Sequence, residues 1–514
     1  MSRLKNFSRN IATSYLQLGV NAIYSLVSVP LILHWLPKAE FGLWAVLVQM
    51  LAYVSIIDLG MTSAVARLLV DHKDDRHNGN YGSLVKTAFG VSLTQGLIIL
   101  VAVALGAPLL ANLMRIPPEH QDTFISLLRI QGCFTAFTFS LRPLGLMLYA
   151  HQRMDLQSYS EMLTLAVLLG LLVCFLNRGY GIYSFIYANG CTLLVGPIFL
   201  FWNCWRIGVL PKAGEWGHAS WKMFREVFNY GKDVFLLNLG SQLIMTSQTI
   251  VVSRTMGLER AAVWSVGTKL FNLVVPLVAR PNGAAMPSMF EMQVRGEKER
   301  LQRRFRAMVL LTASLGAFCG GSFAMCNSLF VQVWTAGKIA WLPLNDMLLG
   351  TWLFILSMQT THSSFVAVTK QIRGMRYIFF AEGCTFFIVS LLLAGRWGVP
   401  GMVLTSICCS LLFSYQYSLR RSHAFFHCSL VELAIKWVLP SLKLAAAFGI
   451  LTIIVSLLDQ GLPVLWRLII HGSVATLIGG LLFLRLGLPK EMITEATTRL
   501  PQSAAKWLQF VSAR

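Results

Sequence analysis

Charged residues are scarce in this chain of 514 residues, at 13% of the sequence, and acidic residues are scarcer still. There are 22 Asp and Glu against 43 Lys and Arg, whereas 55% of the residues are hydrophobic and the mean hydropathy is +0.62. So little charge does not cover the surface of a soluble protein of this length, which excludes that class. The composition predicts an integral membrane protein.

Paired cysteines and a cleavable signal are also lacking. The ten cysteines show no C-x-x-C pair and fall mostly within apolar segments, so neither a disulfide framework nor a metal site is predicted. The first apolar stretch is too long for a signal peptide and has no small-residue cleavage site, so we expect it to be retained as a helix.

Apolar segments long enough to cross a membrane recur along the chain. We predict an all-α polytopic membrane protein with about 14 transmembrane helices. The predicted spans lie near residues 11–36, 42–66, 83–113, 123–150, 157–177, 180–205, 229–253, 261–290, 307–335, 345–368, 378–397, 398–419, 437–457 and 462–486. The boundaries near 178 and 396–400 stay open, because hydropathy does not distinguish a hairpin from one broken helix there.

The cations gather on one side of this topology. An even number of spans places both termini on one side, and the predicted loops of that side contain 27 Lys and Arg against 6 on the other. Since cytoplasmic loops are enriched in these residues, both termini are predicted to be cytoplasmic. The net charge of +21 then reflects topology beside anionic lipid, and no nucleic-acid partner is expected. The outer loops are too short for an external catalytic domain.

Two spans carry a similar polar face. In the first span, polar side chains recur at i, i+4, i+7 and i+11, which is one face of an α-helix. These residues are Gln17, Asn21, Tyr24 and Ser28. The pattern returns 221 residues later as Asn238, Gln242, Met245 and Thr249. Either the similarity is chance or the chain contains a duplicated half, an arrangement common in transporters.

The longest polar break between spans precedes the second copy of this face and marks a domain boundary. We predict two pseudo-symmetric six-helix lobes around a central cavity, followed by two accessory helices and an amphipathic tail on the cytoplasmic face. The predicted ranges are 1–205 for the first lobe, 206–228 for a cytoplasmic loop, 229–419 for the second lobe, 420–486 for the accessory helices and 487–514 for the tail.

Cations deep in the predicted spans indicate a binding site. A central cation costs about 2.5–3.5 kcal/mol on insertion scales, so Arg142 and Lys269 each need water, a partner or an anionic ligand. Together with polar neighbours they are predicted to line a net-positive cavity suited to an anion such as a diphosphate. The predicted substrate-binding residues are Arg142, Lys269, Arg280, Asn21, Gln17, Asn238, Gln242 and Asn272.

Three acidic residues keep an alternative open. Asp58, Glu161 and Glu382 lie in or near predicted spans, where they are available as salt-bridge partners for these cations. Asp58 is alternatively the carrier of a coupling proton or sodium ion. The sequence does not distinguish these roles.

Short motifs near the N-terminus resemble those of a known family. They are Asn21 with Pro30, the run Phe41-Gly42-Leu43-Trp44, and Asp58-Leu59-Gly60 followed by Arg67. In this order they resemble bacterial polysaccharide flippases, the O-antigen (Wzx-type) transporters of the multidrug/oligosaccharidyl-lipid/polysaccharide (MOP) exporter superfamily. The resemblance is strongest over the first 70 residues, and the layout of twelve plus two helices agrees with it over the whole chain.

The resemblance implies a transporter and not an enzyme. It implies alternating-access export, without a cofactor, of an undecaprenyl-diphosphate-linked oligosaccharide from the cytoplasmic to the periplasmic leaflet of the inner membrane. The implied partners are this lipid-linked oligosaccharide, membrane lipids, other polysaccharide assembly proteins, and H⁺ or Na⁺ if transport is ion-coupled. The glycan stays open. Related flippases for the peptidoglycan precursor also have cavity arginines in the first helix, where this chain has only Gln17 and Asn21, which argues against that substrate.

Two other functions are alternatives. An ion-coupled multidrug antiporter of the same superfamily usually has twelve spans and an acidic residue in helix one or seven, where this chain offers only Asp233 at the mouth. A membrane glycan polymerase or ligase normally has a sizeable external loop, which the short outer loops oppose.

Overall fold

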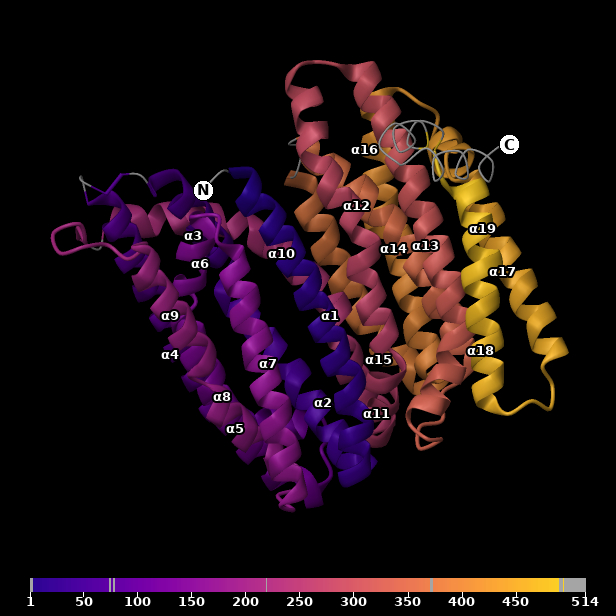
Figure 1. Cartoon of the computed structure of the whole chain (residues 1–514), viewed down its shortest axis with the longest axis horizontal. Coiled ribbons are helices and arrows are strands. Elements are labelled where there is room, and N and C mark those ends of the chain that lie inside the picture. Colours follow the sequence, from indigo (N-terminus) through magenta and orange to yellow (C-terminus); the bar gives the residue numbers. More distant parts are fainter. Residues whose placement is uncertain are drawn as a thin grey trace. The chain divides into compact units, whose positions relative to one another are not determined.

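The computed structural model describes residues 3–73, 75, 76, 79–218, 220–369, 373–489 and 493. Every regular element in this described part is helical, which confirms the predicted all-α class. The chain divides into two compact units, Met1–Ala262 and Val263–Arg514, and the helix α11 (Leu258–Gly267) crosses their boundary. Figure 1 colours the helices along the sequence, from indigo at the N-terminus to yellow at the C-terminus.

The first unit is built from the N-terminal helices. Its elements are α1 (Arg3–Trp35), α2 (Lys38–Ala52), the 3-10 helix η1 (Tyr53–Asp58), α3 (Met61–His72), α4 (Asn80–Leu113), α5 (Pro118–Ser140), α6 (Pro143–Ala150), α7 (Met154–Asn177), α8 (Tyr183–Thr192), α9 (Val195–Ile207) and α10 (Trp221–Met256).

Long helix pairs carry the packing of this unit. Helix α1 runs along α7, as Figure 1 shows, and α4 runs along α5, while α10 packs against α2 and α3. A buried cluster joins α3, α4 and α6 through residues such as Leu69, Leu84 and Met147, none of which is exposed. These contacts hold the short helices α3 and α6, which follow the two helix breaks described below.

The second unit contains the remaining helices. Its elements are α12 (Lys269–Val294), α13 (Lys298–Trp334), α14 (Pro343–Val368), α15 (Arg373–Ser410), the π-helix η2 (Leu411–Tyr415), α16 (Gln416–Phe426), the π-helix η3 (Glu432–Lys436), α17 (Leu439–Leu458), α18 (Val464–Val474), the π-helix η4 (Ala475–Gly479), α19 (Gly480–Leu482) and the π-helix η5 (Phe483–Gly487).

Helix α13 is the centre of this unit and packs against α12, α14, α17 and α18. Gly320 of α13 and Gly350 of α14 face each other so closely that a Cβ on either would overlap the backbone of the other. Small residues of this kind let helices approach closely in membranes, where the hydrophobic effect does not drive helices together.

Ten helices among the described residues are long and apolar enough to cross a membrane, and the bent pair of α11 and α12 supplies an eleventh. The predicted number of 14 is therefore not confirmed. The stretch Gly374–Phe426 is counted once among the ten but holds two helices joined by a kink at Gly398, where φ is 64°, at the predicted boundary between spans 378–397 and 398–419. Helices α10 and α14 overlap two further predicted spans and are not among the ten.

The predicted domain ranges stay a prediction. Helix α10 lies in the predicted second lobe, whereas its packing on α2 and α3 places it in the first compact unit. Most of the predicted tail at 487–514 lies outside the described residues.

Candidate functional site

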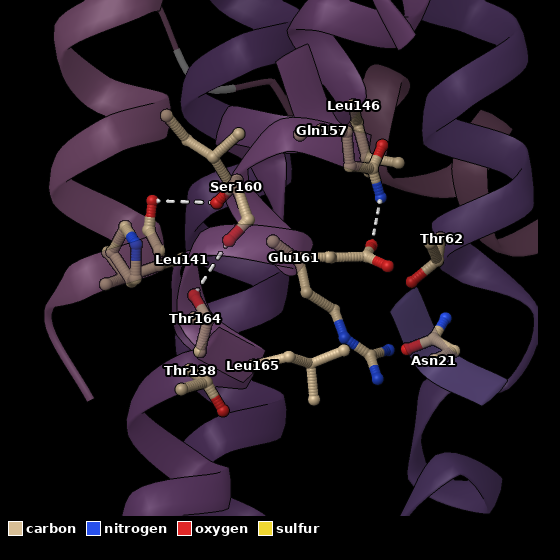
Figure 2. A pocket seen from close by; sticks show the side chains of 15 residues that line it. Asn21, Thr62, Thr138, Leu141, Leu146, Gln157, Ser160, Glu161, Thr164 and Leu165 are labelled. Carbon is tan, nitrogen blue, oxygen red and sulfur yellow. Dashed lines mark hydrogen bonds between the residues drawn. The ribbon is translucent and has the colours of Figure 1, made fainter. Parts of the chain in front are cut away.

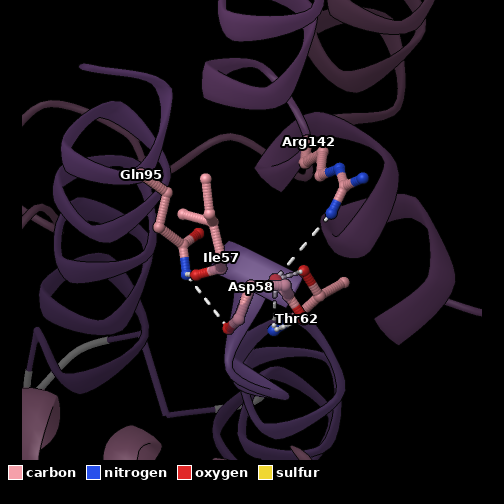
Figure 3. A network of polar contacts seen from close by, with 5 residues as sticks. All are labelled: Ile57, Asp58, Thr62, Gln95 and Arg142. Carbon is pink, nitrogen blue, oxygen red and sulfur yellow. Dashed lines mark hydrogen bonds and ion pairs between the residues drawn. The ribbon is translucent and has the colours of Figure 1, made fainter. Parts of the chain in front are cut away.

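A helix break positions Asp58 in the first unit (Figure 3). The helical path of α2 and η1 ends at Asp58, because Leu59 and Gly60 adopt left-handed conformations with φ of 49° and 73°. Such values are uncommon for residues other than glycine. The Asp58 carboxylate accepts the Thr62 backbone N–H at 3.2 Å and the Thr62 hydroxyl, while Gln95 donates to the Asp58 carbonyl at 3.1 Å. Hydrogen bonds therefore satisfy the groups that the break exposes, as a membrane interior requires.

Arg142 lies at a second break, between α5 and α6. Pro143 begins α6, and proline has no backbone N–H with which to continue the helical ladder. The Arg142 side chain is 39% exposed, and its guanidinium carbon lies 3.5 Å from the centroid of the Phe139 ring. Within the described part of the chain it donates no hydrogen bond. Since a guanidinium has five N–H donors, it keeps ample capacity for a ligand.

The two breaks bring a cation and an anion together. Arg142 Nη1 lies 3.8 Å from Asp58 Oδ1, and the Asp58 side chain is 15% exposed (Figure 3). At this distance the two groups form an ion pair but no direct hydrogen bond, because N–H···O bonds span about 2.7–3.2 Å. Asp58 therefore holds Arg142 loosely and compensates part of its charge.

Arg142 lines a cavity of about 550 Å³, which is within the range of roughly 300–1,000 Å³ for small-molecule sites. Side chains from α1, α3, α5 and α7 also line it, among them Asn21, Thr62, Thr138 and Glu161. Figure 2 shows Asn21, Thr62 and Glu161 directed toward the same space. The cavity thus combines charged groups with amides and hydroxyls, an arrangement suited to a ligand that has an anionic part and a hydroxyl-bearing part.

Amides hold Glu161. Gln157 Nε2 donates to one carboxylate oxygen at 3.4 Å and Gln17 of α1 donates to the other. Within the described ranges Glu161 forms no ion pair, so it is not the partner of Arg142. No metal site forms around it either, since among the described residues no group of three or more His, Cys, Asp or Glu side chains is placed to hold a metal ion.

A second cavity, of about 320 Å³, adjoins the first and shares Thr62 and Arg142 with it. Asp58 and Gln242 line this second cavity, and Gln242 donates to the carbonyl of Ala52 at 3.1 Å. The backbone of the predicted residue 238 belongs to α10, whereas the side chain of Asn238 lies outside the described residues. Asn21 from the first copy of the repeated polar face and Gln242 from the second copy therefore both line cavities of the first unit.

The other predicted residues lie in the second unit and do not line these cavities. Lys269 begins α12 at a bend of 42° after α11, and Asn272 is exposed one turn later. Arg280 lies further along α12 and takes part in contacts of its own. Glu382 is fully buried in α15. A cavity shared by these residues and Arg142 stays a prediction.

Sequence reasoning missed one face of α7. Gln157, Ser160 and Thr164 line the 550 Å³ cavity together with Glu161. Counted from Gln157, Ser160 is at i+3, Glu161 at i+4 and Thr164 at i+7, which is one face of a helix and is visible in the sequence. Counting every polar face, and not only those that contain a cation, would have selected them.

The family model described as polysaccharide biosynthesis protein matches residues 7–293, more than half of the chain. A relative from Shigella flexneri, whose name assigns it as an O-antigen transporter, is 21% identical over 253 residues. The match covers 48% of this chain and 58% of that relative, so the chain spans little more than half the length of this curated relative.

Two solved structures share the fold. The lipid II flippase MurJ in an inward closed conformation matches with a TM-score of 0.69 at 14% identity, over 93% of this chain and 98% of that one. An inward-facing multidrug resistance MATE transporter of the MOP superfamily matches with a TM-score of 0.66 at 13% identity, over 80% and 96%. The family model bears out the predicted resemblance at the level of the family, and the two structures bear it out for the fold alone.

Proposed function

This chain belongs to the polysaccharide biosynthesis protein family, and from that premise we propose that it is a flippase for a polyprenyl-diphosphate-linked oligosaccharide. It moves this glycolipid from the cytoplasmic to the periplasmic leaflet of a bacterial inner membrane by alternating access, without a cofactor and without covalent change to the substrate. The names of the Shigella flexneri relative and of MurJ support this substrate class.

Arg142 is the observation that carries the proposal. Its guanidinium lines the 550 Å³ cavity, donates no hydrogen bond within the described residues and is only loosely paired with Asp58. A diphosphate accepts paired hydrogen bonds from such a group, and charge-assisted bonds of this kind are roughly twice as strong as neutral ones. The neighbouring amides and hydroxyls suit the glycan.

The membrane potential assists the proposed direction. An inside-negative potential favours outward movement of an anion by about 2.3 kcal/mol per unit charge per 100 mV. Coupling to H⁺ or Na⁺ is therefore optional, and Asp58 and Glu161 are the acidic groups of the first unit that would carry such an ion.

Translocation in proteoliposomes tests the proposal. A polyprenyl-diphosphate glycolipid with a fluorescent glycan is placed in both leaflets, and the fraction accessible to a membrane-impermeant quencher is followed over time. We expect wild-type protein to move the glycolipid between the leaflets and Arg142→Gln to lose this activity. Arg142→Lys should keep part of it, because a point charge remains. A wild-type protein that leaves the lipid in place, or that alters its covalent structure, contradicts the proposal.

Glu161 favours a second candidate, an ion-coupled multidrug antiporter. Its carboxylate faces the same cavity without a cationic partner in the described residues, as a cation-binding site requires. This candidate predicts uptake of cationic drugs into vesicles under a proton gradient, lost in Glu161→Gln and indifferent to Arg142→Gln. The opposite pattern supports the flippase.

The orientation is tested separately by cysteine labelling in whole cells. From the cation asymmetry we expect an impermeant thiol reagent to label a cysteine placed at Lys338 and to miss one placed at Arg300. All ten native cysteines are unbridged and must first be replaced. Labelling at Arg300 in intact cells would overturn the predicted topology.

A further inference from the structure

A third cavity of the first unit, of about 240 Å³, is lined only by uncharged residues. It adjoins the 550 Å³ cavity, since Thr138, Thr164, Gly196 and Pro197 line both. We propose that this cavity, termed here the acceptor pocket, is a subsite for the hydroxyl groups of the glycosyl residue next to the diphosphate. The proposal rests on the flippase function proposed above.

Threonine hydroxyls of the acceptor pocket donate their hydrogen bonds to backbone carbonyls of the helices that carry them. Thr135 donates to the carbonyl of Gln131 at 2.8 Å, Thr164 to that of Ser160 at 2.9 Å, and Thr192 to that of Ala188 at 3.0 Å. A hydroxyl has one proton and two lone pairs, so each of these oxygens is left as an acceptor.

Two amides extend the same pattern. Asn189 donates one Nδ2 hydrogen to its own helix, at 2.8 Å from the carbonyl of Phe185, which leaves its carbonyl oxygen as an acceptor and its second N–H as a donor. The buried Oε1 of Gln131 has no hydrogen-bond partner. Buried polar atoms are nearly always paired, so an unpaired acceptor on the wall of a pocket indicates a donor that binds there.

Acceptors without a carboxylate select the ligand class. The acceptor pocket has neither a cation to neutralise a phosphate nor a charged ligand of the kind that normally neutralises a bound cation. A neutral ligand rich in O–H or N–H donors fits instead. Phe134 adds an aromatic face on the pocket wall, against which the C–H groups of a sugar ring can pack.

The position relative to Arg142 matches such a ligand. Thr138, Thr135 and Gln131 lie four, seven and eleven residues before Arg142 along α5, or roughly 6, 10 and 16 Å at 1.5 Å per residue. A diphosphate bound at Arg142 therefore places its attached sugar beside Thr138 and Thr135. In this proposal Arg142 binds the diphosphate and the acceptor pocket binds the sugar of the same substrate.

Binding of two lipids to the purified full-length protein tests the subsite. The probes are a polyprenyl diphosphate and the same lipid carrying one N-acetylhexosamine. Thr135→Val and Thr192→Val each remove a hydroxyl and keep the side-chain shape, and the carbonyl that each hydroxyl contacts still has its helical bond. Thr94→Val is the matched control, because Thr94 makes the same bond to its own helix, to Gly90 at 2.9 Å, but lines none of the three cavities.

We expect wild-type protein to bind the glycosylated lipid more tightly than the bare lipid. Each pocket variant should weaken binding of the glycosylated lipid by about two- to tenfold, the value of one neutral hydrogen bond, and leave the bare lipid unchanged. Arg142→Gln should weaken both probes alike, and Thr94→Val neither. Unchanged melting temperatures show that the variants are folded.

Other outcomes overturn the subsite in distinguishable ways. If the sugar brings no gain in wild-type affinity, or if the pocket variants weaken both lipids equally, the subsite is wrong while the flippase function stands. If their effect requires sodium in the buffer, the acceptors hold a cation and not a sugar. If wild-type protein binds neither lipid, the proposed function and the subsite fall together.

Discussion

The ion pair between Asp58 and Arg142 in the first compact unit differs in length and surroundings from the pair between Asp459 and Arg467 in the second. In the first unit, Arg142 and Asp58 are 3.8 Å apart and their side chains are 39% and 15% exposed. In the second unit, Arg467 Nε lies 2.9 Å from Asp459, whose side chain is only 2% exposed. Asp459 also lies 2.9 Å from His471 Nε2, and the other ring nitrogen of that histidine contacts the carbonyl of Met325 in α13 at 2.9 Å.

The difference separates a pair that holds structure from one that is open to a ligand. The pair at Asp459 is short, has a buried carboxylate and is extended by His471, so it ties α17, α18 and α13 together. The pair at Asp58 is long, borders two cavities and leaves the guanidinium donors unused. Similar chemistry thus serves stability in one unit and, in our proposal, substrate binding in the other.

The largest expected effect is on transport in the first unit. Arg142→Gln should lower the translocation rate in proteoliposomes roughly 10- to 150-fold, which corresponds to the loss of about 1.5–3 kcal/mol from hydrogen bonds to a charged group. The melting temperature should change little, because the ion pair with Asp58 is long and the arginine side chain is 39% exposed. A variant that unfolds as it loses transport would make this pair resemble the one at Asp459.

The same substitution in the second unit should act on stability. Arg467→Gln leaves the buried Asp459 carboxylate with fewer donors, so we expect a loss of about 1–3 kcal/mol in the free energy of unfolding, measured as a lower melting temperature in detergent. Translocation per folded molecule should equal that of the wild type. A selective loss of transport at normal stability would erase the contrast between the two pairs.

A smaller effect distinguishes the two carboxylates of the first unit. Asp58→Asn should reduce translocation several-fold and more than Glu161→Gln, because Asp58 positions Arg142 and also receives the bonds of the helix break. Both variants are measured with an imposed membrane potential and no proton or sodium gradient. Full wild-type turnover under these conditions excludes obligatory ion coupling, whereas a requirement for a gradient makes Asp58 or Glu161 an ion carrier.

The length of the apolar segments predicted the helical class, and periodicity predicted part of the candidate site. The i, i+4 spacing of Gln17 and Asn21 placed both on one face of α1, and the structure brings that face to Glu161 and its cavity. The sequence also selected the deep cation Arg142, because its insertion cost is a property of the sequence, and the structure places it on the wall of the 550 Å³ cavity. Its role as a ligand stays a prediction.

The meeting of Asp58 and Arg142 was beyond the reach of hydropathy. Both residues fall inside segments that were predicted as continuous spans, 42–66 and 123–150, and their approach depends on breaks at Gly60 and Pro143 that redirect the chain. The predicted count of 14 spans is not confirmed, because α10 and α14 overlap predicted spans but are not among the ten described helices that are long and apolar enough to cross a membrane. The predicted boundary between 378–397 and 398–419, in contrast, coincides with the kink at Gly398.

Binding of a polyprenyl diphosphate to purified wild-type, Arg142→Gln and Arg467→Gln proteins tests most directly whether Arg142 is the anion-binding cation. It compares one substitution in both pairs without the complications of transport. We predict that Arg142→Gln weakens the affinity at least about tenfold, as expected for the loss of a charge-assisted hydrogen bond, while folded Arg467→Gln binds like the wild type. Equal affinity for wild type and Arg142→Gln, or an equal loss in Arg467→Gln, would contradict the claim that Arg142 is the anion-binding cation.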